Sequence, residues 1–184
     1  RLVGFTIPAN STDAIFENNA KQIRLQTGTV AGNIIVTPSF STQAGLALSP
    51  PIQTLTTSVP VLPPALSSVT LGAKTTNSFT LQIEGYATGR DVSTVEFQFT
   101  PAAGSNVANT KFTMDVSGAS GVWFRSSSSQ AYGGQFSAAV TFVVAAPPGT
   151  TLAAGTSTVD IIDSVAITIS SASGKSASVT IPIR

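Results

Sequence analysis

Cysteine and histidine are both absent from this chain of 184 residues. Without cysteine, no disulfide can hold the fold together and no thiolate can act as a nucleophile. Without histidine, the commonest general base and the commonest ligand of catalytic zinc are missing. Ser-His-Asp and Cys-His sites are therefore excluded, and we expect a protein that is not an enzyme and uses no cofactor.

Charged side chains are also scarce. They make up 9% of the chain, with a net charge of +1, whereas an ordinary soluble domain has about 25%. This balance provides no basic surface for nucleic acid. A neutral surface rich in Ser and Thr but lacking Cys is typical of large bacterial cell-surface proteins, so we expect an extracellular or cell-surface location.

Long apolar runs are missing as well. The most apolar stretch, residues 138–146, is interrupted by Thr141 and ends at Pro147-Pro148, well short of the roughly 18 residues that cross a bilayer. We therefore expect no membrane-spanning segment. No signal peptide precedes the alternating residues 2–7, which is what a mature chain, a trimmed chain or a fragment would look like.

The dominant feature that is present is a hydrophobic period of two, typical of antiparallel strands with one buried face. It predicts short strands at residues 3–7 and 23–25 and about seven strands later in the chain, with residues 164–183 as a terminal hairpin. The inward-pointing residues of the later region are predicted to be Phe79, Leu81, Ile83, Val95, Phe97, Phe99, Val165, Ile167 and Ile169. The seven later strands are predicted to begin near Leu66, Ser78, Thr94, Thr110, Gly134, Ser164 and Ser176.

Other segments give weaker signals. A short helical turn is expected near residues 12–18, and residues 122–124 are expected to form one more short strand. The segment 145–159, which contains Pro147-Pro148-Gly149, reads as an insertion at one end of the sandwich.

A Pro-rich stretch, residues 60–65, divides the chain. Pro cannot sit within a central strand and favours an extended, semi-rigid connector. We therefore expect an all-β fold of two tandem immunoglobulin-like antiparallel β-sandwich modules, residues 1–59 and 66–184, joined by that linker. The first module is short or incomplete, and its missing strand would come from an upstream part of a longer precursor or from a neighbouring subunit.

Four phrases support this interpretation, at residues 5–11, 26–32, 85–91 and 97–104. They resemble paired immunoglobulin-like repeats of large secreted or cell-surface bacterial proteins, whose function is mostly unassigned. The resemblance implies a multi-domain extracellular context and attaches no catalytic residues to these phrases.

Four aromatic residues are the candidate ligand-facing side chains: Trp123, Phe124, Tyr86 and Tyr132. Exposed and coplanar rings would make a platform on which sugars stack. The favoured alternative is that Trp123, the single Trp, packs into or caps the core. Because neighbouring residues of a strand point to opposite faces, one of Trp123 and Phe124 is expected to be partly exposed.

Charged residues offer weaker candidates. Arg90 and Asp91 could form a local ion pair that fixes a turn. Lys111 beside Glu96 is the one conceivable pairing for an isopeptide crosslink, and no motif supports such a crosslink. Asp160 and Asp163 flank two isoleucines beside a long loop, but dense Asp/Asn/Gly calcium loops are absent, so surface charge is the better interpretation and no metal site is predicted.

These observations favour a non-catalytic extracellular structural or adhesive module, either a segment of a surface stalk or the subunit of a fibre. Its expected partner is protein, through self-association or through neighbouring modules of the same precursor. The alternative is an accessory polysaccharide-binding domain of a secreted hydrolase, which would use the exposed aromatics.

Overall fold

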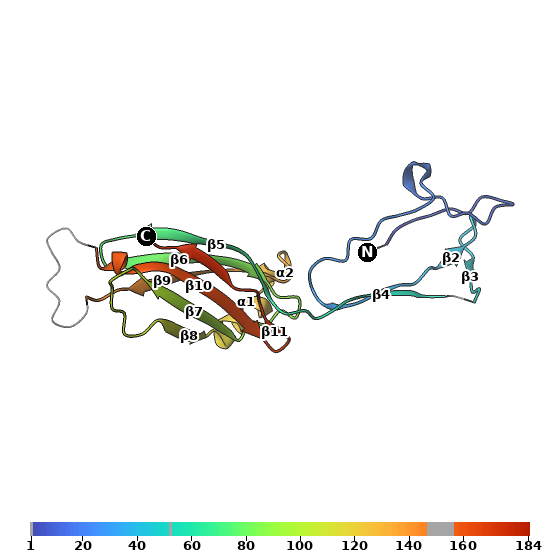
Figure 1. The fold of residues 1–184 in the computed structure, drawn as a ribbon. Coiled ribbons are helices and arrows are strands. Elements are labelled where there is room, and N and C mark those ends of the chain that lie inside the picture. The colour runs from blue at the N-terminus through green and yellow to red at the C-terminus, as the bar shows by residue number, and fades with distance from the viewer. Residues whose placement is uncertain (1, 52, 147–156) are drawn as a thin grey trace.

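The protein is mostly β, and its described strands pair in antiparallel fashion. The structure, a computed structural model, describes residues 2–51, 53–146 and 157–184. Figure 1 shows two parts: a layered body of β-strands that contains the C-terminus, and an extended N-terminal region that leads away from the end where α1 and α2 lie.

Two sheets form the layered body. One contains three strands in the order β5-β6-β9, and in the other β7 lies between β8 and β10, with β11 and β12 both paired to β10. The strands of the two sheets are β5 (Ala65–Lys74), β6 (Ser78–Tyr86), β7 (Thr94–Pro101), β8 (Lys111–Asp115), β9 (Gln135–Val143), β10 (Ile162–Ser171), β11 (Gly174–Lys175) and β12 (Val179–Pro182).

The hydrophobic core lies between these sheets and draws on both of them. Phe79 and Leu81 of β6 and Phe97 of β7 have no exposed surface, and the ring of Phe142 on β9 packs 4.9 Å from that of Phe97, centroid to centroid. All nine residues that the alternation predicted to point inward are buried, so that prediction is confirmed.

The seven later strands are confirmed too, each beginning at or within a few residues of its expected start. The terminal hairpin is present, with Val165 of β10 opposite Ile181 of β12. The period-two pattern is clearest in β6, β7 and β10, which alternate between a buried and a more exposed face. Every residue of β8 is exposed.

The predicted short strand at residues 122–124 is wrong. These residues belong to helix α1 (Ser117–Arg125), which is followed by the single turn α2 (Ser127–Gln130). Gly, Ser and Ala dominate the segment and leave no clear period. The carboxylate of Asp115 starts the helix by accepting hydrogen bonds from the backbone N–H and the hydroxyl of Ser117, at 2.9 and 2.6 Å.

The N-terminal region contains little regular structure. Its elements are a short 3-10 turn η1 (Glu17–Asn19), which overlaps the expected helical turn, and an interrupted hairpin. The hairpin consists of β1 (Gly32–Val36), β2 (Phe40–Ser41), β3 (Ala47–Leu48) and β4 (Leu55–Val59). The strands predicted at residues 3–7 and 23–25 do not form. In the first of these segments, the only pairing described is an isolated bridge between Thr6 and Ile15. Alternation alone makes no strand where no neighbour supplies the ladder of hydrogen bonds.

No side chain is buried among the described residues of the segment 2–59. By contrast, the core cluster lies entirely beyond the Pro-rich residues 60–65. The N-terminal region is therefore not a complete sandwich by itself.

Thr88 connects the two parts. Its carbonyl accepts the backbone N–H of Ala31 at 2.8 Å, and its hydroxyl accepts that of Leu62 at 2.8 Å. Thr88 is 6% exposed. Ser173, beside β11, donates its hydroxyl to the carbonyl of Leu62 at 2.8 Å. The connector is thus held to one end of the layered body.

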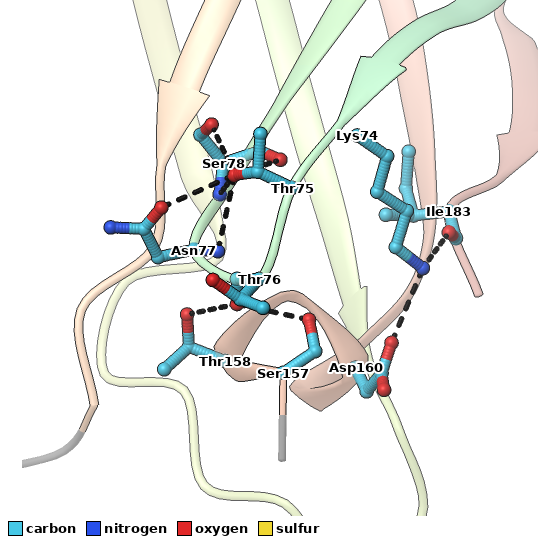
Figure 2. Close-up of polar contacts among 9 residues, drawn as sticks. All are labelled: Lys74, Thr75, Thr76, Asn77, Ser78, Ser157, Thr158, Asp160 and Ile183. Atoms are coloured by element: carbon cyan, nitrogen blue, oxygen red, sulfur yellow. Dashed lines mark hydrogen bonds and ion pairs between the residues drawn. The ribbon is translucent and has the colours of Figure 1, made fainter. Parts of the chain in front are cut away.

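A second network closes the opposite end (Figure 2). The hydroxyls of Ser157 and Thr158 both donate to the carbonyl of Thr76 in the β5–β6 turn, at 3.0 and 3.1 Å. Lys74 donates to Asp160 at 3.2 Å and to the carbonyl of Ile183 at 3.0 Å. Of the expected insertion at 145–159, residues 147–156 lie outside the described part of the chain.

Candidate functional site

A cleft of about 500 Å³ lies where β6, the start of β9 and helix α1 meet. The register of the sheet places Tyr86 opposite Gln135 and Glu84 opposite Ser137. Since successive residues alternate between faces, these four side chains share the outer face of the sheet, while Leu81 and Ile83 point into the core. The sheet thus supplies one wall with both aromatic and polar character.

Helix α1 and the segment after α2 supply the other wall. The indole N–H of Trp123 donates to the carbonyl of Gln135 at 2.9 Å, which fixes the ring against the start of β9. The ring of Tyr132 lies 6.2 Å from that of Trp123, centroid to centroid, with 34° between the planes. Trp123 is half-buried against the core, and Tyr132 is 56% exposed.

Gly85 and Phe136 lie at the back of the cleft. A Cβ atom on Gly85 would stand 2.5 Å from the carbonyl oxygen of Ala65 and 2.7 Å from the ring of Phe136. A glycine is required there because the Phe136 ring and the neighbouring strand approach the backbone so closely.

The structure brings three of the four candidate aromatics together: Tyr86, Trp123 and Tyr132 all line this cleft. The fourth, Phe124, does not belong to it, because it is buried in the core at 7% exposure. Trp123 packs against the core as expected and also faces the cleft. The expectation of opposite strand faces at Trp123 and Phe124 is replaced by helical geometry, in which the two side chains point about 100° apart.

Sequence reasoning missed the polar members of the cleft. Neither Glu84 nor Gln135 is among the candidate residues that the sequence indicated. No local signal marks them, because their proximity to Trp123 depends on the pairing of β6 with β9 and on the path through α1.

Arg90 does not form the expected ion pair with Asp91. Its guanidinium donates to the carbonyl of Phe124 and to the hydroxyl of Ser129, the latter at 2.6 Å, and lies 5.7 Å from the centre of the Phe124 ring. Asp91 instead accepts the backbone N–H of Ala172 at 3.1 Å. Arg90 therefore holds α1 and α2 together through Phe124 and Ser129 and does not fix its own turn.

The remaining charged candidates have structural contacts. Lys111 forms an ion pair with Glu96 at 3.0 Å on the outer side of the β7–β8 pair. Asp160 pairs with Lys74. Within the part of the chain that the structure describes, no three His, Cys, Asp or Glu side chains gather into a group that could hold a metal ion.

Comparison with family models, with curated proteins and with solved structures found no match to the chain. No helix among the described residues is both long and apolar enough to cross a membrane. The class that the structure itself defines is a mostly β protein of antiparallel sheets, with an aromatic cleft beside the β6–β9 pair.

Proposed function

We propose that this chain is a non-catalytic extracellular structural or adhesive module, a segment of a surface stalk or the subunit of a fibre. The observation that carries the proposal is the N-terminal region, whose described residues between 2 and 59 expose large apolar side chains without burying any.

The exposed fractions are large. Leu46 and Leu55 are each 67% exposed and Ile35 is 63% exposed, all in the hairpin between residues 32 and 59. Scattered exposed apolar residues are ordinary. In this region a small cluster of half-buried rings, Phe5, Phe16 and Phe40, packs together, but no described side chain is fully buried. Hydrophobic burial therefore offsets little of the entropy lost in ordering the backbone. Such a region needs a partner to cover it.

Backbone pairing leads to the same conclusion. In the described chain β1 and β4 pair only with one another, so each has a free edge. An isolated two-stranded hairpin is at best marginally stable in water, and a free edge is a template for a further strand. A second copy of the chain or a neighbouring module of the same precursor would supply both the strand and the cover.

For residues 66–184 we propose an immunoglobulin-like sandwich, in tandem with a related first module. The first, second and fifth strands of the body form one sheet, and the third, fourth, sixth, seventh and eighth form the other. Two facing sheets of short antiparallel strands are what this architecture requires, although here the fourth strand pairs with the third rather than with the fifth.

The connection at Thr88 suits a load-bearing or spacing role. Thr88 bonds the Pro-rich connector at Leu62 and the N-terminal region at Ala31, which restricts the angle between the two parts more than a free linker would.

Sedimentation velocity over a range of protein concentrations, combined with hydrogen exchange, tests the proposal. We expect association with rising concentration, and slow exchange of hairpin amides only in the associated form. Leu46→Asp with Leu55→Asp should abolish association, whereas Val143→Asp, at a 75% exposed site on the layered body, should not. A monomer whose hairpin amides already exchange as slowly as those of β6 would contradict the proposal, because such a region needs no partner.

A further inference from the structure

We propose that the cleft between β6, β9 and α1 binds a neutral saccharide. In this arrangement the rings of Trp123 and Tyr132 contact the C–H face of a sugar, and Glu84 and Gln135 bond its hydroxyl groups. The inference concerns a different surface from the N-terminal region and does not depend on assembly.

The ring of Trp123 is held in place by contacts within the protein. Trp123 is held by its bond to the carbonyl of Gln135 and by packing against the core, while Arg90 holds the backbone at Phe124 from below. A preformed aromatic surface binds at a lower cost in conformational entropy than a mobile one. Tyr132, at 56% exposure, leaves ring surface available to a ligand.

The side chains of Glu84 and Gln135, which form the polar part of the cleft, are not engaged by other described side chains. Among the described residues, the three ion pairs involve other acids than Glu84, and Gln135 takes part in hydrogen bonding through its backbone. A carboxylate and an amide beside aromatic rings present acceptors and donors at the rim of an apolar surface. A pyranose has the complementary arrangement, with an apolar face and a ring of hydroxyl groups.

Charge and ring geometry select the class of ligand. Glu84 lines the cleft and no Lys or Arg does, so uronic acids and sulfated sugars would meet repulsion without compensation. The rings of Trp123 and Tyr132 lie 6.2 Å apart with 34° between their planes, an arrangement that can present ring faces to one side of a sugar. A quaternary ammonium is the competing ligand class, because it also binds over aromatic faces, and the choline titration below distinguishes the two. The volume of about 500 Å³ lies within the range of small-ligand sites and suits a short stretch of a glycan.

The single Trp of the chain makes the test direct, because intrinsic Trp fluorescence reports on this cleft alone. The full chain is titrated with neutral hexasaccharides of glucose, xylose, mannose and N-acetylglucosamine, and separately with oligogalacturonate and with choline. We expect saturable fluorescence change with at least one neutral oligosaccharide. Tyr132→Ala and Glu84→Gln should each weaken that binding at least tenfold, and Phe112→Ala, at an exposed aromatic of the other sheet, should not change it.

Fluorescence that stays constant with every neutral oligosaccharide would overturn the inference. So would binding of choline or oligogalacturonate alone, or binding that survives unchanged in both cleft variants. Circular dichroism and the melting temperature of each variant establish that it is folded, and Tyr132 and Glu84 are chosen because both are exposed.

Discussion

Phe97 and Phe112 face each other across β7 and β8 yet differ in environment. They are register partners, but Phe97 has no exposed surface and Phe112, on the outer strand, is 45% exposed. The same side chain therefore contributes differently to the free energy of unfolding at two adjacent positions.

Replacing Phe97 with Ala should lower the free energy of unfolding by about 3 to 5 kcal/mol, because it removes buried apolar surface and leaves a cavity. Phe112→Ala is the matched control and should cost less than half as much. Denaturant unfolding followed by circular dichroism measures both. Equal losses in the two variants would show that the core is not centred on β7.

Asp115 lies immediately before helix α1, and its carboxylate accepts two hydrogen bonds from Ser117. The hydroxyl and then the backbone N–H of Ser117 donate to its carboxylate and hold the pKa of Asp115 below its ordinary value. Since the folded pKa lies below the unfolded one, the stabilisation is complete above the unfolded pKa and is lost as the pH falls through the folded pKa.

Ser117→Ala removes the stronger of these hydrogen bonds, so the pKa of Asp115 should rise toward the ordinary value. Carboxyl chemical shifts measured through an acid titration by nuclear magnetic resonance check this, with Ser127→Ala as the control. An Asp115 pKa that is the same in the wild type and in Ser117→Ala would show that Ser117 does not stabilise the carboxylate.

The loop between β6 and β7 makes hydrogen bonds both to the Pro-rich connector and to the helical segment. It carries Thr88, which holds the connector at Leu62, and Arg90, which holds α1 and α2 through Phe124 and Ser129. One short loop thus orients the N-terminal region and supports the wall of the cleft.

Thr88→Val keeps the shape of the side chain but removes the hydroxyl that bonds Leu62 at 2.8 Å. We expect the layered body to remain folded, with a loss of roughly 1 to 2 kcal/mol, and the N-terminal region to sample a wider range of orientations. Small-angle X-ray scattering of dilute protein should show that broadening. The control is Thr80→Val, which breaks a bond to Thr141 within the sheet. A scattering curve unchanged by Thr88→Val would mean that other contacts hold the connector.

At the scale of the whole molecule, buried side chains are concentrated in the layered body and are missing from the described part of the N-terminal region. The core cluster extends from Val69 to Ile183, whereas the described residues of the segment 2–59 bury no side chain. Local stability follows buried contacts, so the two parts should open with different free energies.

Brief digestion of dilute protein with a protease of broad specificity should therefore cut first within residues 2–59. Mass spectrometry should identify a resistant fragment that begins near residue 60. First cuts inside β6 or β7 would contradict this distribution of stability. Digestion at high concentration, where association is expected, should protect the N-terminal region.

Much of the layered body could be predicted from local patterns. Val165, Ile167 and Ile169 alternate with polar residues, and the period of two identifies both a strand and its buried face. The N-terminal residues 3–7 alternate equally well and form no strand, because a strand requires a neighbour that local sequence does not specify.

The sequence by itself determined the alternating strands of the layered body and the exclusion of chemistry that needs His or Cys, because these depend on residue type and local spacing. Only the tertiary structure decided that Trp123 lies on a helix, that Arg90 reaches Phe124 rather than Asp91, and that Tyr86, Trp123 and Tyr132 share one cleft. The physical reason is that helical phase, strand register and long-range hydrogen bonds set which distant residues meet, and no short segment contains that information.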